Sequence, residues 1–119
     1  MGYYTLYELE AVGVNEETAS KIEEMLKGYD VIEYALEKGG KIGDDRWYWG
    51  SYESVKWYDN DEHMTAISKA FPDVTFCLSG DGEDSDDFWK CYYKNGVSEL
   101  CKAHIVYDEP QTIVWKGGI

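Results

Sequence analysis

Carboxylates are the most concentrated reactive groups in this sequence, and five of them lie in the seven residues from Asp81 to Asp87. Carboxylate oxygens are the ligands that calcium prefers, and an EF-hand loop places them in a fixed order. Counted from Asp81, that order requires Asp or Asn at the fifth position, Gly at the sixth and Glu at the twelfth. The chain has Ser85, Asp86 and Tyr92 at these positions. The spacing therefore predicts no calcium site, and we expect a hydrated turn between two strands.

A second acidic group, Asp59–Asn60–Asp61–Glu62, immediately precedes His63. Asp59 and Glu62 have the spacing of a capping box, in which both side chains satisfy backbone N–H groups at a helix start. No zinc-binding histidine or cysteine pattern accompanies them. The group therefore predicts the beginning of a helix and no metal site.

Nucleophilic catalysis would use the two histidines, His63 and His104, or the three cysteines, Cys77, Cys91 and Cys101. Cys101 and His104 are three residues apart in a predicted strand, so their side chains project to opposite faces. Cys91 and His104 share a predicted face but are not directly opposite each other. The cysteines lack the C-x-x-C spacing of a zinc site and are too few for a disulfide framework, so we expect three unlinked thiols.

Sequence motifs for other enzyme chemistry are missing. The chain has no G-x-S-x-G nucleophile elbow, no Walker loop and no G-x-G-x-x-G. We therefore predict a protein that is not an enzyme and has no cofactor.

The net charge is −13, from 24 acidic and 11 basic residues. A field of this sign repels nucleic acids and anionic membranes, and it attracts the basic surfaces with which other proteins hold DNA or RNA. The alternative is that the acidity serves only to keep the chain in solution. The 11 Tyr and 5 Trp residues favour a contact surface, because their rings suit sites that are apolar on one side and wet on the other.

The chain of 119 residues has the size of one domain, which we assign to residues 1–119. Its first residues, MGYYTLYELE, lack the basic flank and apolar core of a signal peptide. No apolar run approaches the roughly 18 residues of a membrane span. We therefore expect a cytoplasmic protein.

The elements that would position these groups follow from hydrophobic periodicity and turn residues. The pattern predicts strands over Tyr3–Val12 and Val74–Leu78, and helices near 15–28, capped by Asn15, and near 60–71. Asp30–Lys38 is ambiguous between strand and helix, and the aromatic run RWYWGSYESVKWY after it is left unassigned.

Asn95–Gly96 predicts a two-residue hairpin turn between strands 88–94 and 97–107, with Lys94 opposite Val97. This register divides the side chains between two faces. We expect the smaller, cleaner face to pack on the helices and the face that mixes rings with charges to stay open. The core face would hold Phe88, Tyr92, Cys101, Ala103 and Ile105, and the open face Trp89, Cys91, Tyr93, Leu100, Lys102 and His104.

The block Lys56–Gly96 resembles small proteins of tailed phages, prophages and plasmids. The resemblance lies in four motifs: Lys56–Trp57–Tyr58–Asp59, Gly80–Asp81–Gly82–Glu83, Asp87–Phe88–Trp89 and Lys94–Asn95–Gly96. It implies an α+β, ferredoxin-like two-layer sandwich with two helices on one face of an antiparallel sheet. It brings no catalytic residues.

By analogy with small acidic phage proteins, we expect an inhibitor of a host defence system, such as an anti-CRISPR protein or another nucleic-acid mimic. Its partner would be a host protein with a basic, nucleic-acid-binding surface. Charge pairs would act with aromatic anchors, because binding hot spots favour Trp and Tyr. The predicted contact residues are Asp59, Asp61, Glu62, Asp81, Glu83, Asp84, Asp86, Asp87, Trp89 and Tyr93.

Two alternatives to this function stay open. One is a module that binds a small ligand, for example a nucleotide, through the aromatic residues between Trp47 and Tyr58. The other is an accessory phage domain without an inhibitory role.

Overall fold

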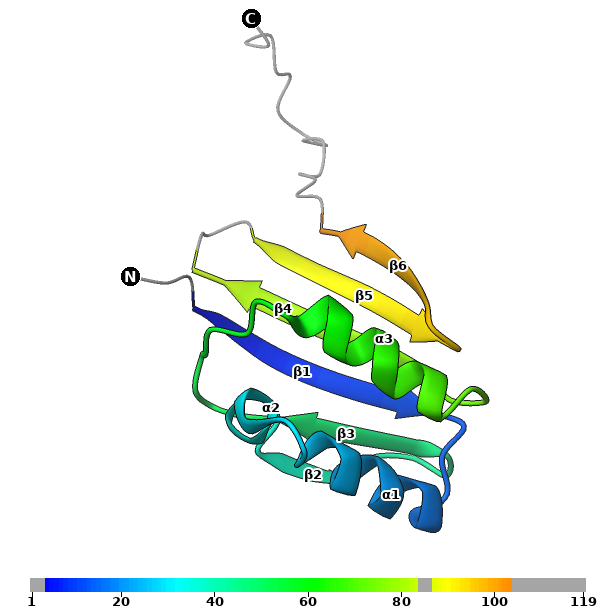
Figure 1. Ribbon diagram of the computed structural model, residues 1–119. Helices are drawn as coiled ribbons and strands as arrows, with labels where there is room; N and C mark the ends of the chain where they lie inside the picture. Colours follow the sequence, from blue (N-terminus) through cyan, green and yellow to red (C-terminus); the bar gives the residue numbers. More distant parts are fainter. Residues whose placement is uncertain (1–3, 84–86, 104–119) are drawn as a thin grey trace, which may run out of the picture.

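The computed structural model describes residues 4–83 and 87–103 (Figure 1). His104, Ile105, Asp84 and Asp86, to which the sequence assigns roles, lie outside the described residues. The elements, in chain order, are β1 (Thr5–Val12), α1 (Glu16–Leu26), α2 (Asp30–Ala35), β2 (Lys38–Lys41), β3 (Arg46–Gly50), α3 (Asn60–Ala70), β4 (Thr75–Gly82), β5 (Phe88–Lys94) and β6 (Val97–Lys102).

The strands form one antiparallel sheet in the order β2-β3-β1-β4-β5-β6. Figure 1 shows all three helices on the same face of this sheet, with α1 and α2 beside β3 and α3 over β4. The prediction of a two-layer α+β fold with an antiparallel sheet is therefore confirmed. The described residues contain both predicted helices, α1 and α3, and also a third, short helix, α2.

Local chemistry explains where α1 and α2 form. The Asn15 side chain accepts a hydrogen bond from the Thr18 N–H at 2.8 Å and caps α1, as the sequence predicts. In the ambiguous stretch after Gly28, Ile32 and Ala35 are buried. These residues are three apart, so a turn of helix places both on the sheet. Packing against the sheet thus makes this stretch helical, although its residues have mixed helix and strand propensities.

The predicted start of α3 is correct in position but wrong in mechanism. Asp59 occupies the N-cap position, yet its side chain makes no capping hydrogen bond. The Asn60 amide instead donates to the Trp57 backbone oxygen at 2.8 Å. The capping box fails because the Asp59 backbone has a ψ of 22°, outside the extended region that an N-cap side chain needs to reach back to the helix.

The core lies between the sheet and the helices, and β1 shows how it is built. Thr5, Tyr7, Leu9 and Ala11 alternate with more exposed residues and are buried. Large buried side chains from β3, β4 and the chain before α3 complete the core, among them Trp49, Phe76 and Trp57.

The hairpin register is confirmed. Lys94 pairs with Val97, and the turn residues Asn95 and Gly96 have φ angles of 48° and 79°. Both angles are positive, as the favoured two-residue turn requires.

The predicted facing of the hairpin is wrong. Cys91 and Tyr93 are buried, at 5% and 1% exposure, whereas Phe88 and Tyr92 are 46% and 41% exposed. The reason is the pairing of β5 with β4, which places Tyr93 opposite Phe76 and therefore on the helix side. Cys101, also predicted to face the core, is exposed, and so is Ala103.

Among the residues that the structure describes, no helix is both long enough and apolar enough to cross a membrane.

Candidate protein-binding surface

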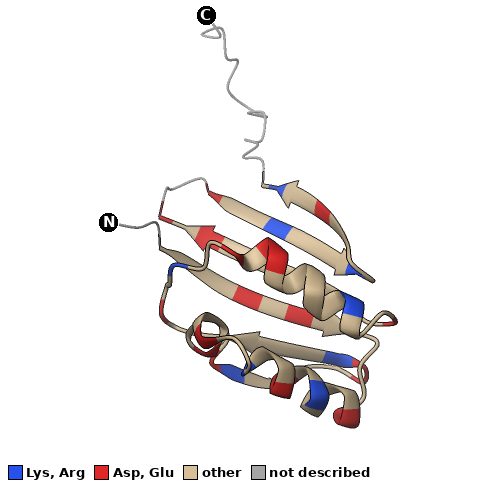
Figure 2. Cartoon of the chain, in the orientation of Figure 1, with Lys and Arg blue, Asp and Glu red and all other residues tan. Residues whose placement is uncertain are grey.

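The fold brings the two acidic stretches of the sequence to one end of the molecule. α3 begins where β4 ends and β5 starts, and Figure 2 shows acidic residues at all three places. We call this group the acidic end; its described members are Asp59, Asp61, Glu62, Asp81, Glu83 and Asp87. All are exposed except Asp87, which is half-buried. Thus the structure brings together six of the eight predicted acidic contact residues, and Asp84 and Asp86 lie outside the described residues.

Asp61 and Asp87 flank a groove of about 490 Å³ on the helix side of the sheet. We call it the helix-side groove. Trp89, Cys91 and Leu100 supply much of its apolar lining. Lys102 lines it as well, so the groove has two carboxylates and one ammonium group beside its apolar side chains, and it can accept a basic side chain together with an apolar one.

Trp89 is the predicted aromatic anchor that the structure leaves accessible. It is half-buried, and its ring meets that of Tyr7 edge to face with centroids 6.1 Å apart. The indole also lies against Gly80, where an added Cβ would be only 2.3 Å from the ring. Trp89 is therefore held in place on one side and open to the groove on the other.

Tyr93 is not available as a second anchor, which corrects the sequence prediction. Its ring is 1% exposed, and its hydroxyl donates to an Asp61 carboxylate oxygen at 2.8 Å. Burial, together with hydrogen bonds to Cys91 and Asp61, raises the pKa of Tyr93 well above its ordinary value. Tyr93 thus fixes the position of Asp61. Leu100, which is 58% exposed in the same groove, is a contact residue that sequence reasoning missed.

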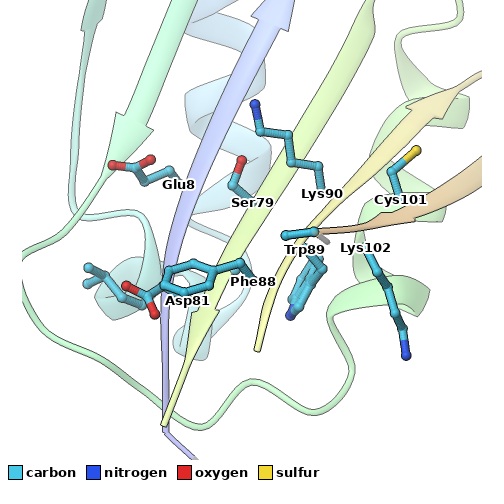
Figure 3. Close-up of a pocket in the computed structure, with 11 residues that line it drawn as sticks. Glu8, Ser79, Asp81, Phe88, Trp89, Lys90, Cys101 and Lys102 are labelled. Carbon is cyan, nitrogen blue, oxygen red and sulfur yellow. The ribbon is translucent and has the colours of Figure 1, made fainter. Parts of the chain in front are cut away.

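A second groove, of about 450 Å³, lies on the sheet face that no described helix covers (Figure 3). Glu8, Ser79, Lys90 and Cys101 form a row across it, because each is the direct neighbour of the next in the strand register. Phe88 lies beside this row. The groove therefore offers charges of both signs, and Asp81 of the acidic end is among the residues that line it.

Metal binding gains no support from this arrangement. Within residues 4–83 and 87–103, no three His, Cys, Asp or Glu side chains come together as a set that could hold a metal ion. His63 accepts a hydrogen bond from the Trp57 indole at 2.9 Å, which uses its Nδ1 atom in the core.

The aromatic residues between Trp47 and Tyr58, on which the small-ligand alternative rests, lie in different parts of the fold. Trp49 and Trp57 are in the core, at 2% and 1% exposure, whereas Tyr52 and Tyr58 are 92% and 69% exposed. Tyr48 points to the open face and donates to Glu8 at 2.9 Å. These rings are dispersed over three environments: the core, the solvent-exposed surface and the open sheet face.

The three cysteines are free and differ in burial: Cys91 is buried, Cys77 half-buried and Cys101 exposed. Burial raises the pKa of both the Cys77 and the Cys91 thiols, which lowers their reactive thiolate fraction. We predict that a thiol reagent labels Cys101 roughly tenfold or more faster than Cys77, and labels Cys91 only on unfolding. Peptide mapping during labelling checks the order. Fewer than three reactive thiols in the unfolded, unreduced chain would instead reveal a disulfide.

No protein-family model, curated protein or solved structure matches the chain. The resemblance of Lys56–Gly96 to small phage proteins accordingly stays a prediction. Three of its four motifs converge at the acidic end: one leads into α3, one ends β4 and one begins β5.

Proposed function

We propose that this chain is an acidic protein-binding inhibitor that occupies the basic, nucleic-acid-binding surface of a host defence protein. The observation that carries the proposal is the convergence of two acidic stretches, distant in sequence, at one end of the molecule, where Asp61 and Asp87 line a groove that contains Trp89. Carboxylates beside an apolar groove resemble phosphates beside bases, and a basic nucleic-acid site recognises both features.

The charges and the apolar residues have separate tasks in this proposal. Exposed carboxylates act through a long-range field, so they raise the association rate more than they slow dissociation. Trp89 and Leu100 act at short range, because their contacts form only when water leaves the groove. Asp61 contributes to the long-range field and to the short-range contacts, since Tyr93 holds its carboxylate at the groove.

We also propose that the fold is ferredoxin-like, with the β5–β6 hairpin as an extension. The support is the chain order β1, α1 followed by the short α2, β2, β3, α3, β4, combined with the sheet order β2-β3-β1-β4, which is a split βαβ arrangement. The hairpin adds two strands beside β4. It supplies Trp89 and Leu100, so the extension carries the proposed apolar contacts.

Capture of partners from host lysate, followed by mass spectrometry, identifies the protein on which the inhibitor acts. Association kinetics then test the role of the acidic end. Replacing the five carboxylates at 81, 83, 84, 86 and 87 with Asn or Gln should slow association about tenfold or more at low salt. The loss should shrink as salt rises, because the Debye length falls from about 10 Å at 0.1 M to about 3 Å at 1 M.

A matched control removes five carboxylates from other exposed positions: Glu16, Glu17, Asp44, Asp45 and Asp73. Both variants change the net charge equally, so the proposal requires a clearly smaller loss in the control. Trp89→Ala should mainly accelerate dissociation. If the variant neutralised at 81–87 associates at the wild-type rate in low salt, the acidic loop is only a hydrated turn and the proposal fails.

A further inference from the structure

The two edges of the sheet are unequally protected against pairing with another chain. At one edge, β2 consists of Lys38, two glycines and Lys41. Lysines on a short strand are a known means of blocking further strand addition. At the other edge, β6 has the sequence VSELCK, and all six of its residues are exposed. β6 is longer than β2 and has one lysine, Lys102, where β2 has two, and no other described strand pairs with it on this side, so we infer that the β6 edge is less protected than the β2 edge.

The register of β5 and β6 shows which backbone groups face outward. The Ala103 N–H donates to the Phe88 oxygen at 3.0 Å, so these two residues form a hydrogen-bonded pair. Such pairs alternate along an antiparallel ladder, which assigns the residues at 97, 99 and 101 to bonds with β5. The N–H and C=O groups of Ser98, Leu100 and Lys102 consequently point away from β5, to the edge with which no other described strand pairs.

The same three residues line the helix-side groove. Their side chains lie on the helix side because they pair with Tyr93, Cys91 and Trp89 respectively. A strand added to β6 would therefore place every second side chain on the groove side, about 6.7 Å apart along the strand. There it would meet the apolar surface of Leu100 and Trp89, the carboxylates of Asp61 and Asp87, and the ammonium group of Lys102.

We propose that β6 binds an extended segment of the partner protein, which adds to the sheet as a further antiparallel or parallel strand. The segment carries basic and apolar side chains at alternate positions facing the groove. Charge complementarity selects this occupant: the groove has two carboxylates, Asp61 and Asp87, against one lysine, Lys102, and the net charge of −13 opposes pairing with a second copy. The inference rests on the proposed function, because it specifies how the partner engages the acidic end.

The probe is a library of random ten-residue peptides displayed on phage and selected against the full chain. Selected peptides should alternate basic and apolar residues, and each is then synthesised with blocked ends. Amide hydrogen exchange of the ¹⁵N-labelled chain is measured with and without the peptide. The amides at 98, 100 and 102 should exchange rapidly in the free protein, and at least about tenfold more slowly in the complex, since strand addition gives them acceptors.

Leu100→Pro tests the backbone directly. Proline removes the outward N–H and leaves the bonds to β5 in place, which is why edge strands tolerate it. We expect it to weaken peptide binding at least about tenfold, whereas Leu100→Val, which keeps the N–H and an apolar side chain, should cost less than about threefold. If Leu100→Pro does not fold, the hydrogen-exchange pattern of the wild-type chain with and without peptide is sufficient to show whether the peptide pairs with β6.

Several results would overturn the inference. In hydrogen exchange, these are that no selected peptide slows exchange of the amides at 98, 100 and 102, or that the peptide slows exchange at β2 instead. A third is that Leu100→Pro binds the peptide as tightly as the wild type does. A fourth is that the same amides already exchange slowly in the free chain, because its own residues protect them. The proposed function can survive each of them. If neutralising the acidic end still slows association with the partner while Leu100→Pro does not affect it, the partner docks through side chains and not through the β6 edge.

Discussion

Trp57→Ala is expected to reduce the free energy of unfolding by about 3–5 kcal/mol, because truncating a buried tryptophan leaves a large cavity. The Trp57 side chain is 1% exposed and packs edge to face on Tyr7, with ring centroids 5.1 Å apart. Its indole N–H donates to His63 at 2.9 Å, and its backbone oxygen accepts from the Tyr7 hydroxyl at 3.2 Å. The residue thus connects α3 to β1. Folded domains typically have a free energy of unfolding of about 5–15 kcal/mol, so the substitution would remove a large share of the stability.

Denaturant unfolding of three variants measures this effect. Trp57→Phe keeps most of the ring volume but leaves the His63 nitrogen without its donor, so an intermediate loss is expected. Tyr52→Ala is the control, because its ring is 92% exposed and surface changes usually cost less than about 0.5 kcal/mol. Equal stabilities of Trp57→Ala and Tyr52→Ala would show that Trp57 does not pack in the core.

The second large effect is a loss of stability at alkaline pH, and Tyr93 is its main source. Burial raises the pKa of Tyr93 above the ordinary value of about 10, so above pH 10 the unfolded chain releases a proton that the folded chain keeps. The free energy of unfolding must then fall as pH rises, by about 1.4 kcal/mol per pH unit for each such group. Below pH 10 the contribution of Tyr93 is fully present.

Tyr93 does not act alone in this pH range. Burial also raises the pKa of Tyr7, and burial with the hydrogen bond to Glu8 raises the pKa of Tyr48 to about 12. The wild-type chain should therefore lose several kcal/mol between pH 10 and 12. In Tyr93→Phe the free energy of unfolding should fall less steeply above pH 10, by about 1.4 kcal/mol per pH unit, because one fewer proton is released on unfolding. At pH 7 the variant should be less stable by about 1 kcal/mol, because the hydrogen bond to Asp61 is lost.

Chemical denaturation at intervals between pH 7 and 12 provides the measurement. Tyr34→Phe serves as the matched control, since it removes the same hydroxyl from a ring that is 64% exposed. Identical slopes for wild type and Tyr93→Phe above pH 10 would mean that the Tyr93 hydroxyl is not buried, and would remove the basis for its role in positioning Asp61.

The acidic end depends both on local sequence and on contacts between residues that are distant in the chain. Both acidic stretches are visible in the sequence, and each was predicted as a contact region. Their meeting depends on α3, which runs back along the sheet so that its first turn lies beside the start of β5. The split of the two predicted rings, with Trp89 at the groove and Tyr93 buried, depends on the same contact, because Tyr93 reaches Asp61 in α3.

By itself the sequence determined features whose energies are local: the Asn15 cap of α1, the alternation of β1 and the register of the Asn95–Gly96 hairpin. Each depends on residues a few positions apart, so a short stretch contains the whole cause. Only the tertiary structure decided which face of that hairpin is buried. Both faces carry aromatic rings, and the choice comes from the pairing of Tyr93 with Phe76, which the helices cover. A facing that is set by strands and helices elsewhere in the chain has no signal in the hairpin's own residues.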